Sequence, residues 1–320
     1  MSHSVFLTGA TGFVGGAVLH RLVKDGYSIT APVRSSSNKQ EKGVAFIPFD
    51  SFAGACWSDA LAGVKTVVHC AARVHVMNET DADPLIAFRQ VNVEATLNLA
   101  RQAVEAGVQR FVFISSIKVN GEGTQTGSPY SADDQPAPAD PYGISKMEAE
   151  QALRALSSET AMEVVIIRPV LVYGPGVKAN FLSMMRWLDK GVPLPFGAIH
   201  NSRSLVALDN LVDLIVTTIS HPAAANQTFL VSDGEDLSTT QLLRRMAQAL
   251  GQTARLLPVP SWMLSSTATL LGKKSLSQRL CGSLQVDIRK TRSLLQWVPP
   301  VTVDSALKAV AEHYRKHIKQ

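Results

Sequence analysis

Residues 4–15 read SVFLTGATGFVG and decide the fold class. The apolar stretch Val5–Leu7 predicts a buried strand, and three glycines follow it before a segment of helical period. Gly9 permits a tight turn, Gly12 lets backbone approach a pyrophosphate, and Gly15 lets the helix pack closely on the strand. Free N–H groups at the start of a helix favour phosphate binding. The segment predicts a dinucleotide-binding loop, in which further nucleotide contacts are expected from Thr11, Phe13 and Val14.

Short apolar runs alternate with longer segments of helical period after this loop. This alternation is typical of a parallel sheet covered on both faces. We expect strands at residues 4–8, 28–33, 44–48, 66–70, 110–115 and 164–168, and helices at residues 12–25, 84–106 and 142–158. The predicted fold class is α/β, a Rossmann-type doubly wound parallel sheet.

Beyond about Tyr173 prolines and glycines become more frequent, which predicts a second and more irregular part. Helices are expected there at residues 181–190, 208–220, 238–250 and 303–318. We predict a dinucleotide-binding domain of residues 1–170 plus 206–232 and a smaller α/β substrate-binding C-terminal lobe of residues 171–205 plus 233–320. Substrate clefts usually form between such a lobe and the C-terminal ends of the parallel strands.

The composition excludes several classes of protein. The 320 residues are 46% hydrophobic and 18% charged, unlike a collagen-like or largely disordered chain. A net charge of +5 suits an anionic ligand, but the basic residues do not run together, so no nucleic-acid partner is expected. Three cysteines without a CxxC pattern argue against a disulfide framework and a metal site. The longest apolar stretch, Trp262–Leu271, is too short to span a bilayer, and no signal peptide is evident, so we expect a cytoplasmic protein with no membrane span.

The ends of the second and third strands are expected beside the adenosine of the cofactor. NAD-binding proteins usually place an acidic residue roughly 20 residues after the glycines, where it bonds the ribose 2′-hydroxyl. Residues 31–36 read APVRSS instead, and no acid occurs before Glu41. Arg34 suits the 2′-phosphate of NADP, because its guanidinium makes charge-assisted forked bonds. NADP is therefore favoured and NAD stays the alternative, with Asp50 as a candidate partner for the adenine amino group.

A Tyr-x-x-x-Lys pair, Tyr142 and Lys146, opens a predicted helix that Asp140 can cap. Residues four apart share a helix face, so phenol and ammonium can act on one ligand. A nearby cation lowers the pKa of a phenol, which would make Tyr142 a proton donor or acceptor. The end of the fifth strand supplies a hydroxyl from Ser116, for which Ser115 could substitute by register.

These features together resemble the extended short-chain dehydrogenase/reductase family of the NAD-dependent epimerase/dehydratase type, over nearly the whole chain. The matching segments are Thr8–Gly15, His69–Ala72, Asn92–Thr96, Ser116 with Tyr142 and Lys146, Arg168-Pro169 and Tyr173–Gly176. The resemblance implies that Ser116, Tyr142 and Lys146 are the catalytic residues. It also implies that Ala71, Ala72 and Asn92 lie at the cofactor.

Members of this family that act on nucleotide sugars are similar to the C-terminal half as well. The resemblance implies contacts to a UDP-sugar from the start of a helix at Asn180 and Phe181, from a strand containing Pro195 and Phe196, and from two phosphate-binding arginines, Arg203 and Arg279. Lys118 stands where small residues are usual in relatives, and Asn120 stands where tyrosine is common. Both positions face the sugar in relatives, so we expect these two residues to bear on substrate identity.

The resemblance is greatest to bacterial reductases and epimerases that act at C4 of N-acetylated UDP-sugars in surface-polysaccharide synthesis. The favoured hypothesis is an NADPH-dependent 4-ketoreductase of a UDP-2-acetamido-2,6-dideoxy-4-keto-hexose, because Arg34 fits NADPH. The alternative is a UDP-hexose 4-epimerase that retains NAD, including a form with a lipid-linked sugar in which Trp262–Leu271 touches a membrane. A catalytically silent NADP-sensing protein is a third hypothesis. Relatives also imply a homodimer through residues 84–106 and 142–158.

Overall fold

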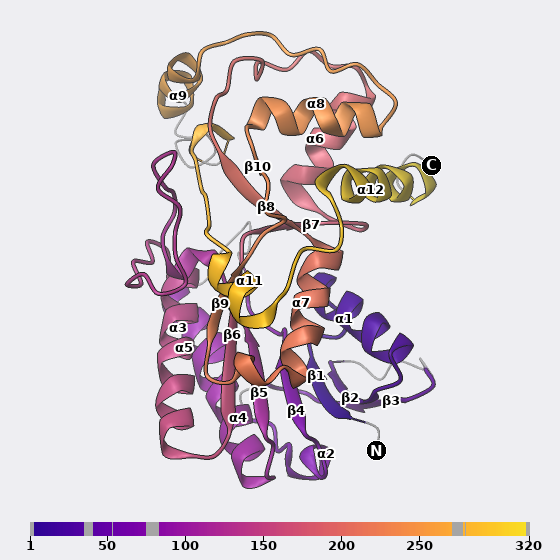
Figure 1. The fold of residues 1–320 in the computed structure, drawn as a ribbon, viewed down its shortest axis with the longest axis vertical. Helices are drawn as coiled ribbons and strands as arrows, with labels where there is room; N and C mark the ends of the chain where they lie inside the picture. The colour runs from indigo at the N-terminus through magenta and orange to yellow at the C-terminus, as the bar shows by residue number, and fades with distance from the viewer. Residues whose placement is uncertain are drawn as a thin grey trace.

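The computed structural model describes residues 3–34, 41–52, 54–74, 83–270, 278 and 280–317. Its larger sheet has seven strands that all pair in parallel, in the order β3-β2-β1-β4-β5-β6-β9. Figure 1 shows this sheet in one half of the molecule. The strands are β1 (Ser4–Thr8), β2 (Ser28–Val33), β3 (Val44–Pro48), β4 (Thr66–His69), β5 (Arg110–Ile114), β6 (Glu163–Pro169) and β9 (Thr228–Val231).

The strand order reverses between β1 and β4, which is the topological switch point of a doubly wound sheet. A crevice forms at such a point beyond the C-terminal ends of the strands, so the site is expected beyond Thr8 and His69. The glycine loop follows Thr8 directly. The expected fold class is therefore confirmed.

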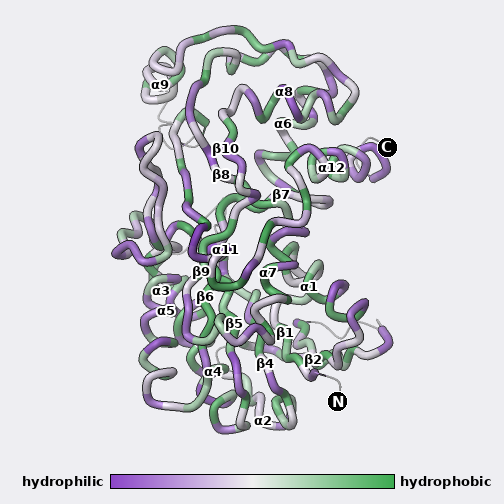
Figure 2. The backbone as a smooth tube through the Cα atoms, in the orientation of Figure 1, coloured by the Kyte–Doolittle hydropathy of each residue, from purple (hydrophilic) through white to green (hydrophobic). Residues whose placement is uncertain are grey.

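Helices cover both faces of this sheet (Figure 1). Strand residues alternate between the faces, so Val5 and Leu7 pack with α1 (Phe13–Lys24) and α7 (Leu208–Ser220), whereas Phe6 packs with α4 (Ala95–Glu105) and α5 (Pro141–Glu159). Figure 2 shows the hydrophobic residues concentrated on the strands and on α7. The remaining elements around the sheet are α2 (Ser58–Leu61), α3 (Pro84–Arg89), α11 (Arg289–Leu295) and the 3₁₀ turns Ile117–Val119 and Pro222–Ala224.

A second sheet of three strands, in the order β10-β8-β7, forms the C-terminal lobe. Its own core lies between this sheet and α6, α8 and α12. The elements are β7 (Leu171–Tyr173), β8 (Arg203–Ala207), β10 (Asp236–Leu237), α6 (Ala179–Asp189), α8 (Thr239–Ala249), α9 (Ser261–Leu270) and α12 (Val303–His317). Among the described residues, no helix is long and apolar enough to cross a membrane.

The helix expected at residues 84–106 is interrupted. It runs as α3, a π-helical segment Gln90–Glu94, and α4, with helical backbone at both junctions. A π-helical turn widens a helix locally and often marks a functional position. It contains Asn92, one of the residues expected at the cofactor.

Candidate active site

The glycine loop after β1 has the geometry that its sequence predicts. Gly9 has a φ of +71°, and a Cβ there would lie 2.8 Å from the Ala71 nitrogen. A Cβ on Gly15 would lie 2.1 Å from the Gly9 carbonyl oxygen, so α1 approaches the end of β1 too closely for any side chain. Gly12 caps α1 without a side chain, and no acidic residue stands in the first turn. The loop therefore offers backbone N–H groups in a cradle that fits a pyrophosphate.

The end of β4 forms the opposite wall of this cradle, and Thr8 holds it in place. The Thr8 hydroxyl lies 2.8 Å from His69 Nδ1 and accepts a 3.1 Å bond from the Ala71 nitrogen. The other ring nitrogen of His69 lies 2.9 Å from the Thr96 hydroxyl. Burial lowers the pKa of His69 to about 3, so the ring is neutral. This arrangement fixes the backbone at Ala71 and Ala72, and the sequence analysis did not foresee it.

Tyr142 stands in the first turn of α5 and meets the end of β5. Its hydroxyl is hydrogen-bonded to Ser116. The helix start is fixed by Asp140, whose Oδ1 accepts a 2.7 Å bond from the Gly143 nitrogen. Desolvation raises the pKa of Tyr142 to about 12, and the bond to Ser116 opposes that rise. The phenol is therefore protonated at neutral pH in this structure.

Lys146 lies one turn later and is buried. Its Nζ donates a 2.6 Å bond to the Ile114 carbonyl and sits 3.9 Å from the centre of the Phe113 ring. Burial lowers the pKa of this ammonium to about 7. In this structure the ammonium is directed at the end of β5, and Lys146 is not among the groups that lower the pKa of Tyr142.

Ser115 and Ser116 point to different partners, which removes the ambiguity of register. The Ser115 hydroxyl donates a 2.5 Å bond to Glu150, and Glu150 also accepts two bonds from Arg168 at 2.9 and 2.6 Å. All three residues are buried. Ser115 thus belongs to a buried ion-pair network that ties β5 and β6 to α5, and Ser116 is the hydroxyl at Tyr142.

Asn120 joins the same network, contrary to the expectation that it faces the sugar. Its side-chain oxygen accepts a 2.9 Å bond from Arg168, and its nitrogen donates to the Ser131 carbonyl. Because Arg168 must be satisfied inside the protein, the amide at this position is held in the interior.

Lys118 lies beside the start of α5. Its ammonium is paired with the Glu122 carboxylate at 3.0 Å and with the Asp140 carboxylate that caps the helix. The side chain is half-buried. Lys118 therefore partly neutralises Asp140, a charge that raises the pKa of Tyr142.

Comparisons with known proteins agree with this geometry. The family model described as the NAD dependent epimerase/dehydratase family matches residues 5–232. A protein of Vibrio cholerae named UDP-glucose 4-epimerase is 51% identical over 98% of this chain and 96% of its own. The chain belongs to the NAD-dependent epimerase/dehydratase family.

Other proteins are less similar to this chain but match it over nearly its whole length. An Escherichia coli O157:H7 protein, N-acetyl-alpha-D-glucosaminyl-diphospho-ditrans,octacis-undecaprenol 4-epimerase, is 28% identical over 100% of this chain and 98% of its own. The solved structure of UDP-glucuronic acid 4-epimerase from Bacillus cereus in complex with NAD has a TM-score of 0.79 at 19% identity, over 98% of this chain and 99% of that one. The structural likeness shows the shared fold.

The family's fourth-strand and helix motifs meet at Asn92. Its amide oxygen accepts a 2.8 Å bond from the Arg73 nitrogen, and its amide nitrogen donates to the Arg73 carbonyl and to Ser145. Asn92 thus links the loop after β4 to α5, the helix of Tyr142. Its role in this structure is to align two walls of the site, and contact with the cofactor stays a prediction.

Arg34 and Asp50 emerge at the same edge of the sheet as the glycine loop. Val33 and Pro48 are partners in the β2–β3 pair, so the residues that follow them leave the sheet side by side. Both Arg34 and Asp50 are exposed. This placement suits the adenosine end of a dinucleotide, and the two contacts stay predictions.

The residues expected at the substrate are placed unevenly. Phe181 is buried and its ring stacks on Tyr173, with ring centres 5.4 Å apart, and the contact expected from this helix start stays a prediction. Asn180 is exposed at the start of α6, and Pro195 and Phe196 are partly exposed before α8. The Arg203 guanidinium donates a 3.0 Å bond to the Gly282 carbonyl. Arg279 lies outside the described residues.

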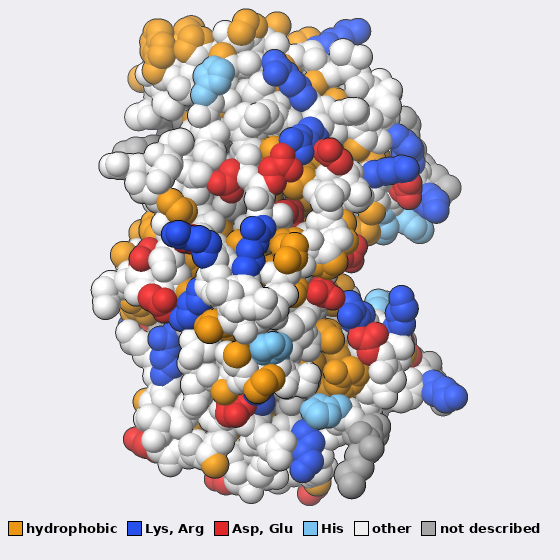
Figure 3. Space-filling model, in the orientation of Figure 1, with side chains coloured by type: hydrophobic (Ala, Val, Ile, Leu, Met, Phe, Trp, Pro, Cys, Tyr) orange, Lys and Arg blue, Asp and Glu red, His pale blue; other side chains and the backbone are white. Residues whose placement is uncertain are grey.

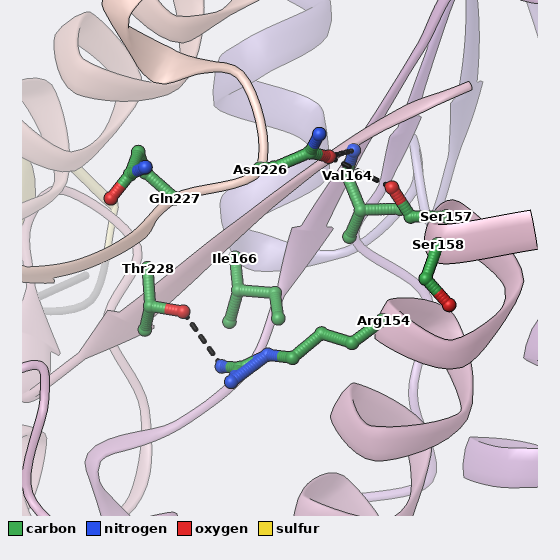
Figure 4. Close-up of a pocket in the computed structure, with 8 residues that line it drawn as sticks. All are labelled: Arg154, Ser157, Ser158, Val164, Ile166, Asn226, Gln227 and Thr228. Atoms are coloured by element: carbon green, nitrogen blue, oxygen red, sulfur yellow. Dashed lines mark hydrogen bonds between the residues drawn. The ribbon is translucent and has the colours of Figure 1, made fainter. Parts of the chain in front are cut away.

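A hollow of about 280 Å³ lies elsewhere, where α5 meets β6 and β9 (Figure 4). Arg154 donates a 2.7 Å bond to Thr228 across it, and Ser157 donates a 2.8 Å bond to Asn226. None of the expected cofactor or substrate residues lines it. Its polar groups bond to one another and join helix to sheet, so we assign it no catalytic role.

Among the residues that the structure describes, no group of three or more His, Cys, Asp and Glu side chains is placed to hold a metal ion.

Proposed function

We propose that this protein is a UDP-hexose 4-epimerase that retains NAD. The observation that carries the proposal is the 51% identity, over nearly the full length, to a protein named UDP-glucose 4-epimerase. The arrangement of Ser116, Tyr142 and Lys146 beyond the glycine loop supports it. The comparisons favour this alternative over the 4-ketoreductase that Arg34 suggested in the sequence.

The site residues fit a dinucleotide, because side chains on Gly9 and Gly15 would fill the cradle at the start of α1. When bound there, the nicotinamide supplies a hydride acceptor for C4 of the sugar. As a phenolate, Tyr142 Oη takes the proton from the sugar 4-hydroxyl and returns it after the ring has turned, while Ser116 holds that sugar hydroxyl by a hydrogen bond. The pKa of about 12 for Tyr142 requires a nearby cation during this transfer, and Lys146 is the candidate one turn away.

The epimerase and the ketoreductase differ in whether they consume the cofactor. An epimerase returns the hydride to the sugar, so it has no need to exchange the nucleotide. A ketoreductase must release NADP and bind NADPH in each turnover. The ketoreductase stays the second candidate because Arg34 is exposed after β2, where an NAD-binding protein usually has an acid.

One experiment separates the two. Purified protein is denatured, the released nucleotide is identified, and the untreated protein is incubated with UDP-glucose or UDP-N-acetylglucosamine without added cofactor. Bound NAD and conversion to the C4 epimer support the proposal. Protein without nucleotide, inert until NADPH and a 4-keto sugar are added, would contradict it. A polyprenyl-diphosphate sugar is tested as a further substrate, because the Escherichia coli relative is named as a 4-epimerase of such a compound.

We also propose that the enzyme is a cytoplasmic homodimer. The free cysteines at positions 56 and 70 suit a reducing compartment. Helices α3 and α5 lie side by side, joined by the Arg89–Glu148 pair, and Ile86 on α3 is exposed beside them. Pairing of these helices across a two-fold axis would bury Ile86. Light scattering should give a dimer for the wild type and a monomer for Ile86→Asp; a wild-type monomer at micromolar concentration contradicts the proposal.

A further inference from the structure

Lys118 joins the two segments that carry the hydroxyl groups of the site. It stands two residues after Ser116, in the 3₁₀ turn Ile117–Val119 that follows β5. Its ammonium pairs with the Asp140 carboxylate at the start of α5. Lys118 therefore connects the segment of Ser116 to the helix of Tyr142.

The backbone of Lys118 holds the same two segments together. Its N–H donates a 3.3 Å bond to Ser116 Oγ, which leaves the hydroxyl proton of Ser116 to be donated to Tyr142. Its carbonyl oxygen lies 2.9 Å from the point where a Cβ on Gly143 would stand, so α5 packs directly on this turn. The first turn of α5 thus approaches Ser116 as closely as a glycine permits.

The Asp140 carboxylate has one oxygen for each of two partners. Its Oδ1 accepts the 2.7 Å bond from the Gly143 nitrogen that caps α5, and its Oδ2 accepts a bond from the Lys118 ammonium. The helix cap and the ion pair therefore depend on one carboxylate, which also raises the pKa of Tyr142. Lys118 opposes that rise, because a carboxylate paired with a cation exerts a weaker field on the phenol.

Among the described residues, the charged side chains around Tyr142 come from three parts of the chain. They are Asp140 and Lys146 on α5, Lys118 and Glu122 after β5, and Arg73 after β4. Arg73 lies over the Phe88 ring, and that ring meets the Tyr142 ring at 6.0 Å. Of these charges, the Asp140 carboxylate is the one that shifts the pKa of Tyr142. Its pairing with Lys118 therefore bears directly on the phenol.

We propose that Lys118 is a positioning residue that acts through Asp140 to hold Tyr142 against Ser116 for proton transfer. By pairing with Asp140, it also limits the negative charge that the phenolate meets. This role rests on the proposed function of Tyr142 as the group that takes and returns the proton. A contact of the Lys118 ammonium with the sugar is the competing role, and the experiment separates the two.

A fluorinated tyrosine at position 142 tests this proposal without any substrate. 2,3,5-Trifluorotyrosine has a lower phenol pKa than tyrosine, and its ¹⁹F chemical shift reports ionisation. In the full-length protein, Lys118→Met should raise the midpoint of this titration by about half a pH unit, because the Asp140 charge is then unpaired. Asp140→Asn keeps a capping side chain and should lower the midpoint. Lys118→Arg should stay near the wild-type midpoint, since a guanidinium also pairs with a carboxylate.

The double variant decides whether Lys118 acts through Asp140. Lys118→Met should leave the midpoint unchanged when it is made in the Asp140→Asn background. An equal shift in both backgrounds, or no shift from Lys118→Met alone, would overturn the proposal.

Kinetics with a sugar that the enzyme converts separate positioning from substrate binding. Lys118→Met should lower kcat at neutral pH by about threefold or more and leave KM unchanged, because a smaller fraction of Tyr142 is ionised. A raised KM with an unchanged ¹⁹F midpoint would assign Lys118 to the sugar instead. A wild type without turnover would contradict the proposed function, whereas the ¹⁹F titration would still decide the role of Lys118.

Lys290 provides a matched control. Its ammonium pairs with Asp133 at 2.6 Å, and its side chain is 26% exposed, against 27% for Lys118. Basic and acidic side chains are interspersed on the face drawn in Figure 3, and pairs on a surface contribute little to stability. Lys290→Met should keep the wild-type midpoint, kcat and KM. A midpoint shift as large as that of Lys118→Met would show a general effect of charge and contradict the proposal.

Discussion

Replacing Lys146 by methionine should stabilise the protein while removing its activity. Lys146 is 1% exposed, and burial lowers the pKa of its ammonium from 10.5 to about 7. A tenfold change in an acid constant equals about 1.4 kcal/mol, so this lowering corresponds to about 5 kcal/mol of folding free energy lost when the group is charged. The cost is fully present below the folded pKa.

Methionine retains an unbranched side chain over the Phe113 ring and carries no charge. It leaves the Ile114 carbonyl without the 2.6 Å bond from Lys146, which costs about 1–3 kcal/mol. The difference favours the variant, so we expect Lys146→Met to raise the free energy of unfolding by about 2–4 kcal/mol near pH 6. Turnover should be lost, because Tyr142 then lacks its candidate cation.

The gain has a defined dependence on pH. The unfolded chain keeps the lysine proton until about pH 10.4, whereas the folded protein releases it near pH 7. Between these values the unfolded state binds more protons, so wild-type stability rises with pH. The advantage of the variant should therefore be full at about pH 6 and absent at about pH 10, as measured by urea denaturation.

An exposed lysine provides the control for this measurement. Lys308 lies exposed on α12, so Lys308→Met should shift stability little and equally at each pH. If Lys146→Met destabilises the protein at about pH 6, or if its effect does not change with pH, the argument from burial fails.

Three further substitutions test the remaining site residues. Tyr142→Phe should lower turnover by about 10²–10⁴-fold and leave the amount of bound nucleotide unchanged, because the phenol acts in proton transfer; turnover within a few-fold of wild type would remove its assignment. Arg34→Asp should lower the affinity for NADPH relative to NADH by roughly tenfold or more in competition binding, since a charge-assisted contact contributes about 1.5–3 kcal/mol. An unchanged ratio of the two affinities would mean that Arg34 does not contact the cofactor. Arg203→Ala should raise KM for the UDP-sugar and leave the affinity for NADPH unchanged, and Arg203→Lys should restore KM in part. Weakened cofactor binding in Arg203→Ala would contradict the placement of the substrate in this lobe.

The cofactor half of the site could be predicted because its determinants are local in sequence. The apolar strand and the three glycines lie within residues 4–15, and the close approach of Gly15 to Gly9 follows from their spacing. The start of α5 could also be predicted from the sequence, since Asp140 caps the helix three residues before Gly143. Each feature depends on one turn of backbone, which the residue types determine without information from distant segments.

The substrate half depends on contacts between segments far apart, which the sequence analysis could not resolve. Whether Ser115 or Ser116 meets Tyr142 is decided by Glu150, which takes the Ser115 hydroxyl from a helix 35 residues away. Asn120 is held inside by Arg168, and Phe181 is turned inward by Tyr173. The strands β7, β9 and β10 have two to four residues, too few to show a periodicity. A motif places such residues near the site but does not set the direction of their side chains.

Arg34 shows how one residue type led the sequence analysis to favour the reductase over the epimerase. A side chain at the end of β2 bears on the adenosine ribose, at the opposite end of a dinucleotide from the nicotinamide. It can select a phosphate or a hydroxyl there, but it does not touch the carbon that gains or loses hydride. The inference from Arg34 to a reductase therefore joined two separate questions, the identity of the cofactor and the fate of the hydride. The 51% identity bears on the whole chain, including the substrate lobe where the sugar is expected, and for that reason it outweighs Arg34 in choosing the epimerase.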